Sequence, residues 1–69
     1  MTELVREAVR DGRRVALLRC YDGENATIVD YEADASGRRG TYRFATAPEA
    51  FRFVQEALLA LQYLGCTVE

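Results

Sequence analysis

The sequence predicts an α+β fold with the element order α-β-β-β-α: a three-stranded antiparallel meander, a long C-terminal helix packed on one face, and a short C-terminal edge strand. Three observations lead to this prediction. Three apolar-rich segments between residues 14 and 46 are separated by short turns that contain glycine. Apolar residues then recur at helical spacing between Ala50 and Leu64. Finally, 69 residues are enough for one domain and too few for two, so we expect residues 1–69 to form a single small domain.

A short helix is predicted at the N-terminus. Thr2 is a suitable N-cap, and Gly12 stands where a glycine commonly ends a helix. The residues between them form a narrow apolar stripe at helical spacing: Leu4, Val5, Ala8 and Val9. We therefore expect a helix from Thr2 to about Asp11.

The three strands of the meander are predicted at residues 14–21, 26–32 and 41–46. Turn residues fill the first connection, at 22–25, and glycine and serine mark the second, at 35–38. Turn residues in both connections favour antiparallel hairpins.

The two hairpins agree on which residues share a face. Closing the first turn on residues 23–24 pairs Leu18 with Val29. Closing the second turn on residues 36–37 pairs Val29 with Phe44. Because a slip of one residue would move every side chain to the other face, this agreement supports the pairing. The shared face is predicted to carry Ala16, Leu18, Cys20, Thr27, Val29, Tyr31, Tyr42 and Phe44.

The opposite face of the meander is half apolar. It carries Leu17 and Ile28, and the predicted register sets Asp30 directly across from Arg43. We expect this face to be covered either by the first helix or by a partner.

The C-terminal helix has a clear start and end. Thr46 and Glu49 match a capping box, with Pro48 in the first turn, and Gly65 ends the helix. The last residues, 66–69, are expected to add a short edge strand. About half of the helix circumference is apolar and should pack on the aromatic face of the sheet: Ala50, Phe51, Phe53, Val54, Ala57, Leu58, Ala60, Leu61 and Leu64.

Composition narrows the classes of function. Nine arginines and eleven acidic residues give a net charge of −2, without a basic field for nucleic acid or anionic lipid. We find no apolar run long enough to span a membrane and no signal-peptide pattern at the N-terminus, so we expect a cytoplasmic protein.

Catalytic, metal-binding and cofactor-binding residues are not predicted. The chain has no histidine, and Cys20 and Cys66 lack the spacing of a zinc site. Asp30 and Glu32 share a strand face, but a half-solvated strand with an ion pair explains them better than acid–base chemistry. Cys20 lies on the core face in the predicted register, which indicates a buried structural thiol. The chain is therefore expected not to be an enzyme.

The outer side of the predicted C-terminal helix is the strongest candidate for a binding surface. Arg52, Glu56, Leu59 and Tyr63 follow i, i+4, i+7, i+11 spacing and so form one stripe. Leucine and tyrosine beside arginine are common at interface centres, although single exposed apolar residues are also ordinary.

The leading hypothesis is a small protein-interaction or regulatory module, such as a regulator or inhibitor. It would self-associate, for example as a homodimer, or dock on a larger protein partner. The helix stripe, or the sheet face with Leu17 and Ile28, would make the contact. Small domains often gain part of their stability from oligomerisation, which supports the hypothesis of self-association.

The alternative is a nucleic-acid-binding domain. Arg38 and Arg39 lie in a glycine-containing loop, and Arg43 follows closely. Arginines at a hairpin tip could contact phosphates. The competing reading is a tight turn that arginine keeps soluble, and the inward direction predicted for Tyr42 favours it.

Overall fold

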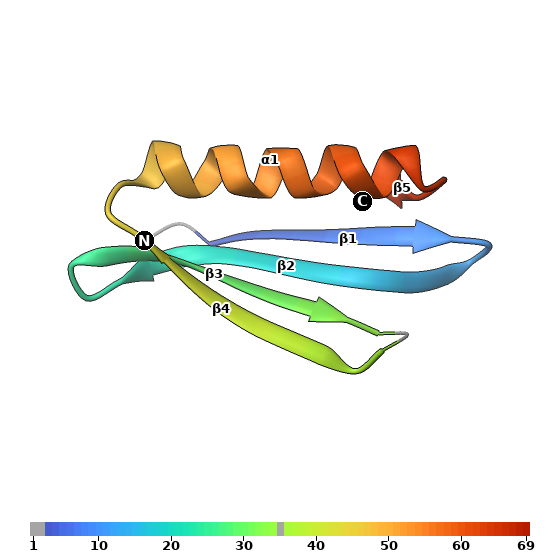
Figure 1. Ribbon diagram of the computed structural model, residues 1–69, viewed down its shortest axis with the longest axis horizontal. Coiled ribbons are helices and arrows are strands. Elements are labelled where there is room, and N and C mark those ends of the chain that lie inside the picture. Colours follow the sequence, from blue (N-terminus) through green and yellow to red (C-terminus); the bar gives the residue numbers. More distant parts are fainter. Residues whose placement is uncertain (1–2, 35) are drawn as a thin grey trace.

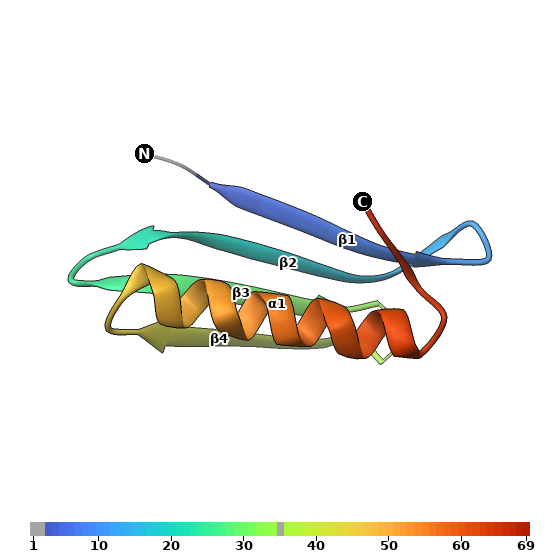
Figure 2. The same ribbon diagram turned by 90° about the horizontal axis from the view of Figure 1, so that it is seen from above.

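The computed structural model describes residues 3–34 and 36–69, which form one antiparallel sheet of five strands with one helix along one face (Figure 1, Figure 2). The elements are β1 (Leu4–Arg10), β2 (Arg13–Gly23), β3 (Ala26–Ala33), β4 (Arg38–Phe44), α1 (Ala47–Tyr63) and β5 (Thr67–Val68). The order in the sheet is β4-β3-β2-β1-β5. The predicted α+β class is confirmed, but the meander contains four long strands instead of three.

The predicted N-terminal helix is wrong, because Leu4–Arg10 form strand β1, paired with β2 along its whole length. Thr2, its expected cap, lies outside the described residues. Asp11 and Gly12 have φ angles of 54° and 76°, which makes them the two-residue turn that right-twisted hairpins favour. A helix of ten residues is marginal in water, whereas β1 gains a ladder of hydrogen bonds and buries Ala8 completely.

The helix covers only one face of the sheet (Figure 1). We call this side the helix face and the other side the open face. The open face was expected to be covered by the first helix or by a partner. The N-terminal segment is a strand, so no helix lies on the open face in the described part of the chain.

The predicted strand registers are each shifted by two residues. Val29 lies opposite Cys20 on β2 and opposite Tyr42 on β4, not opposite Leu18 and Phe44. The first turn falls at residues 24–25, where Asn25 accepts a φ of 57°. A shift of two preserves the faces, so the predicted shared face is correct although its individual pairs are not.

The predicted pairing of Asp30 with Arg43 is also wrong, for the same reason. Asp30 lies opposite Thr41, and Arg43 lies opposite Ile28.

The start of α1 follows the prediction closely. Thr46 is the N-cap, its hydroxyl accepts from the Glu49 N–H at 3.5 Å, and it donates to the Glu49 carboxylate at 2.8 Å. At the other end, Gly65 has a φ of 92° and its N–H bonds the Gln62 carbonyl at 2.9 Å. Within the described residues, no helix is long and apolar enough to cross a membrane.

The predicted C-terminal edge strand is present as β5. It pairs with β1 through Ala8 and Val68, and Glu7 and Glu69 exchange two backbone hydrogen bonds of 2.9 and 2.8 Å. The segment therefore closes part of the edge that β1 would otherwise leave open.

The core lies between α1 and the helix face, as predicted, and it is small. The largest fully buried side chains are Leu18 and Val29. The main buried cluster is Leu18, Cys20, Val29, Ala50 and Val54. A second cluster at the β5 end is Ala8, Ala16 and Cys66.

Candidate protein-interaction surfaces

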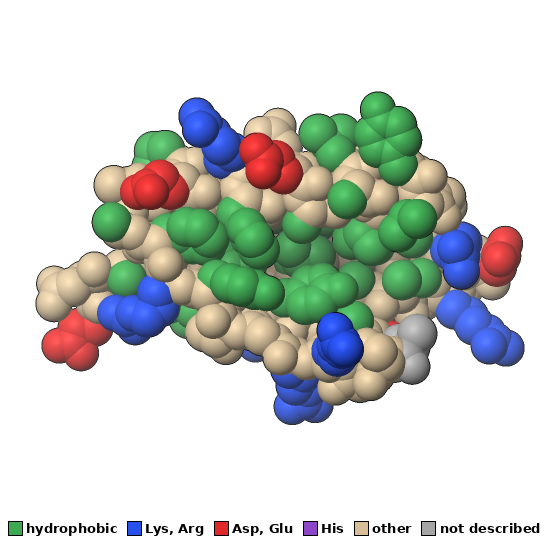
Figure 3. Space-filling view, viewed as in Figure 1, with side chains coloured by type: hydrophobic (Ala, Val, Ile, Leu, Met, Phe, Trp, Pro, Cys, Tyr) green, Lys and Arg blue, Asp and Glu red, His purple; other side chains and the backbone are tan. Residues whose placement is uncertain are grey.

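The outer stripe of α1 lies where the sequence places it. We define it by its four residues, Arg52, Glu56, Leu59 and Tyr63, all of which are exposed. Tyr63 is 92% exposed and Leu59 is 52% exposed, and together with Gln62 they line a small surface hollow. Figure 3 shows hydrophobic side chains on the outer side of the helix near its C-terminal end.

Leu59 and Tyr63 of the outer stripe belong to neither of the two buried clusters. The opposite side of the helix supplies Ala50 and Val54 to the core. We therefore expect truncation of Leu59 or Tyr63 to disturb the core little.

The open face offers less apolar surface than expected. Ile28 is only 6% exposed, because it packs against Gly23: a Cβ added there would lie 2.7 Å from the Ile28 Cγ1 atom. Leu17 is half-buried. These two predicted contact residues thus lie on one face of the sheet but provide little area for a partner.

Polar groups dominate the open face instead. The Tyr21 hydroxyl donates to Asp30 at 2.9 Å, and the Thr41 hydroxyl donates to the same carboxylate at 3.0 Å. The bond to Asp30 raises the pKa of the Tyr21 hydroxyl, because it favours the protonated phenol. Arg19 binds Glu3 at 2.6 Å, and this bond raises the pKa of the Arg19 guanidinium.

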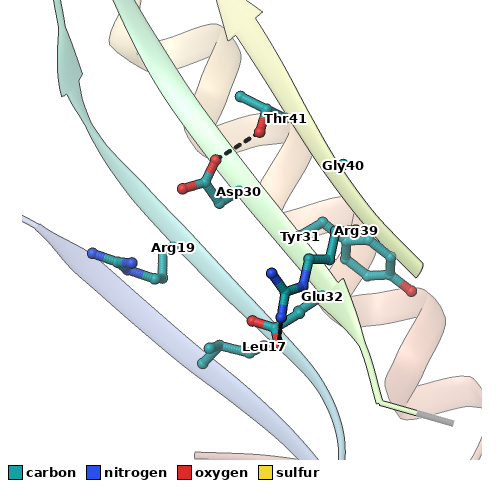
Figure 4. A pocket seen from close by; sticks show the side chains of 8 residues that line it. All are labelled: Leu17, Arg19, Asp30, Tyr31, Glu32, Arg39, Gly40 and Thr41. Atoms are coloured by element: carbon teal, nitrogen blue, oxygen red, sulfur yellow. Dashed lines mark hydrogen bonds and ion pairs between the residues drawn. The ribbon is translucent and has the colours of Figure 1, made fainter. Parts of the chain in front are cut away.

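A shallow hollow on the open face is lined by both Asp30 and Glu32, and Figure 4 shows Asp30 beside Thr41 and Glu32 beside Arg39. It has a volume of about 280 Å³. Each acid has partners: Asp30 accepts from two hydroxyls, and Glu32 lies 3.8 Å from the Arg39 guanidinium. The ion pair expected between Asp30 and Arg43 is therefore absent from the described residues: the partners of Asp30 are hydroxyl groups, and Glu32 is the acid that lies near an arginine.

Both cysteines are buried free thiols. Cys20 lies in the core, and burial raises the pKa of its thiol, with a smaller contribution from the charge of Asp22. This matches the structural role that the sequence indicates for Cys20.

The three arginines of the alternative site lie on one strand but not on one face. Arg39 and Arg43 lie on the open face, whereas Arg38 and Tyr42 belong to the helix face. The Arg43 guanidinium donates to the Glu24 carbonyl at 3.2 Å. A base stacked on Tyr42 would therefore lie on the other side of the strand from Arg39 and Arg43.

The sequence did not predict one exposed apolar surface beside β4, because the whole aromatic face of the sheet was expected to lie under the helix. Tyr42 remains 44% exposed, and its ring packs on Phe53 with centroids 4.8 Å apart. An apolar groove runs between α1 and β4, lined by Tyr31, Tyr42, Phe53, Ala57, Ala60 and Leu61. Figure 3 shows it as a band of hydrophobic side chains between the helix and the strand below it. The aromatic residues were visible in the sequence, but the position of β4 at the edge was not.

Comparison of the chain with models of known protein families, with curated proteins and with solved structures found no match.

Proposed function

We propose that the chain is a small non-enzymatic protein-interaction module, a regulator or inhibitor that self-associates or docks on a larger protein. The observation that carries this proposal is the exposure of Leu59 and Tyr63 on the outer stripe. Large apolar side chains flanked by Arg52 and Glu56 have the composition of an interface centre with a charged rim.

The size of the chain supports the same proposal. A standard interface takes about 800 Å² from each partner. That is about one sixth of the 4974 Å² surface of this chain. Because the intramolecular core is small, burial of the outer stripe would add substantially to the apolar area removed from water.

Self-association is tested by sedimentation velocity of the wild type and of a Leu59→Arg, Tyr63→Glu double variant. We expect an assembled wild type and a monomeric double variant, because two charges would be buried unpaired. Glu24→Arg, an exposed substitution at the β2–β3 turn and so outside α1, serves as the control. A wild type that stays monomeric at high concentration removes the self-associating version.

Docking on a larger partner is tested with a photo-crosslinking amino acid at position 59 in living cells, with the exposed position 24 of the β2–β3 turn as the control site. The proposal expects one protein adduct specific to position 59. A chain that is monomeric and gives no site-specific adduct would contradict the proposal as a whole.

Nucleic-acid binding is the second candidate, supported by Arg39, whose side chain is 80% exposed at the β3–β4 hairpin. It expects salt-dependent RNA or DNA binding that weakens in an Arg38→Ala, Arg39→Ala variant. The control removes two exposed arginines elsewhere, Arg6→Ala and Arg13→Ala. Absence of gel retardation at low salt would end this candidate.

A further inference from the structure

Strand β4 (Arg38–Phe44) is an open edge of the sheet. In the described part of the chain it pairs with β3 alone. An edge strand has unpaired backbone N–H and C=O groups along its outer side, and these can pair with an added strand. Seven residues are enough to hold an extended segment of another chain by β-augmentation.

The charges of β4 favour an acidic occupant over a second copy. The strand carries three arginines and no acidic residue. Pairing two β4 strands would gather six arginines along one seam. The antiparallel register that pairs all seven residues would set Arg39 directly opposite Arg43 of the other copy. Like charges directly opposite each other destabilise a strand pair.

A strand that pairs with β4 would meet different surroundings on the two faces of the sheet. On the open face, Arg39 and Arg43 flank Thr41. On the helix face, the Tyr42 ring leans over Gly40, where an added Cβ would lie 3.4 Å from it. The apolar groove adjoins this side. A strand added about 4.8 Å beyond β4 would therefore place every second side chain against the groove.

We infer that the β4 edge accepts an extended segment of a partner protein as a sixth strand. Acidic side chains of that segment face Arg39 and Arg43 on the open face, and apolar side chains fill the groove beside Tyr42, Phe53 and Ala60. This inference rests on the proposed function as a protein-interaction module, but it uses a surface separate from the outer stripe.

The test is an NMR titration of the ¹⁵N-labelled chain with the synthetic peptide Ser-Glu-Val-Glu-Leu-Glu-Val-Glu-Ser. Its acidic and apolar residues alternate as the two sides of β4 require. We expect amide shifts concentrated on β4, with smaller shifts along the groove. A peptide with lysine in place of glutamate, and a shuffled peptide of the same composition, should bind at least about tenfold more weakly.

Two variants probe the two sides separately. Arg39→Gln with Arg43→Gln should weaken binding of the acidic peptide about tenfold and reduce its salt dependence. Ala60→Arg, which places a charge in the exposed wall of the groove, should also weaken binding. The matched control, Arg6→Gln with Arg13→Gln, makes the same change in net charge far from β4 and should bind like the wild type.

Several outcomes would overturn the inference. The β4 amides could stay unshifted at millimolar peptide, which would mean that the arginines only guard the edge against pairing. The three peptides could bind equally. A single-stranded oligonucleotide could shift the same amides more strongly than the peptide, which would point to nucleic acid. In each case, assembly or crosslinking through the outer stripe would still be measurable, so the inference can fail while the proposed function stands.

Discussion

Leu18 and Leu59 have the same side chain in opposite environments. Leu18 of β2 is almost fully buried against α1, whereas Leu59 is 52% exposed on the outer stripe. The same side chain thus fills the core at Leu18 and lies at the surface at Leu59.

Replacing Leu18 by alanine should lower the free energy of unfolding by about 2–5 kcal/mol, because it leaves a cavity in a core that has few large side chains. Leu59→Ala should change it by less than about 0.5 kcal/mol, because the side chain is not part of the core. Urea unfolding of both variants measures the difference. Equal losses would show that Leu59 is packed in the folded chain.

Asp34 and Arg14 form the best-aligned ion pair of the described residues, with two bonds of 2.7 and 2.8 Å. The bonds from Arg14 hold the pKa of the Asp34 carboxyl below its ordinary value. The folded state therefore binds this proton less readily than the unfolded state. The contribution to stability is complete above the unfolded pKa of about 3.9 and is lost as the pH falls through the folded pKa.

An Asp34→Asn variant should be less stable than the wild type at pH 7, and the difference should shrink as the pH falls below about 4. Urea unfolding of both chains at several pH values measures it. The difference in unfolding free energy between the two chains removes the contribution of the other carboxylates, because these titrate in both. A difference that does not change with pH would contradict a role for the charge.

At the scale of elements, the turn at Asp11–Gly12 determines whether the N-terminal segment forms a helix or a strand. The N-terminal segment has apolar residues that fit both a short helix and a half-buried strand. The Asp11–Gly12 turn folds it onto β2, and the backbone ladder then outweighs a marginal helix.

Gly12→Val should destabilise the chain by about 1–2 kcal/mol, because a β-branched residue is strained at a φ of 76°. The space around a Cβ at this position is open, so the cost comes from the backbone alone. Gly12→Asn is the matched control, since asparagine tolerates the left-handed conformation and should cost less. Thermal unfolding compares the variants, and equal effects would contradict the strained turn.

At the scale of the whole molecule, the sheet is one layer with a helix on one side. Extents of 38 × 20 × 18 Å reflect this elongated shape. The two buried clusters each contain one cysteine, Cys20 under α1 and Cys66 beside β5. Thiol reactivity therefore reports on both ends of the core.

Both thiols should react slowly with a disulfide reagent in the folded chain, since they are buried and the raised pKa of Cys20 reduces its thiolate. In urea they should become reactive together at the unfolding midpoint. A Cys66→Ser variant isolates Cys20 and assigns the rates. Fast reaction of Cys66 in native buffer would show that β5 opens locally instead of with the whole fold.

Local chemistry made several parts of the fold predictable from sequence. Thr46 marks the start of α1 and Gly65 marks its end. Both were predictable because a capping side chain and a glycine with positive φ act on residues next to them in sequence. The composition of the helix face was predictable because strand alternation survives a register shift of two. The outer stripe was predictable for the same kind of reason, since helical spacing fixes which residues face away from the sheet.

The remaining features depend on which segments meet. Residues 4–10 became a strand because β2 was available to pair with them, and the sequence of that segment does not show this by itself. The burial of Ile28 depends on Gly23, which lies across the β2–β3 hairpin. The register predicted for this hairpin differs from the observed one by two residues, so the contact could not be predicted. The open edge of β4 and its groove depend on strand order and on the path of α1, so no local pattern could reveal them. Periodicity determined the faces of each element, because it is a property of neighbouring residues. Tertiary structure decided which faces and edges stay uncovered, because covering them requires contact between distant segments.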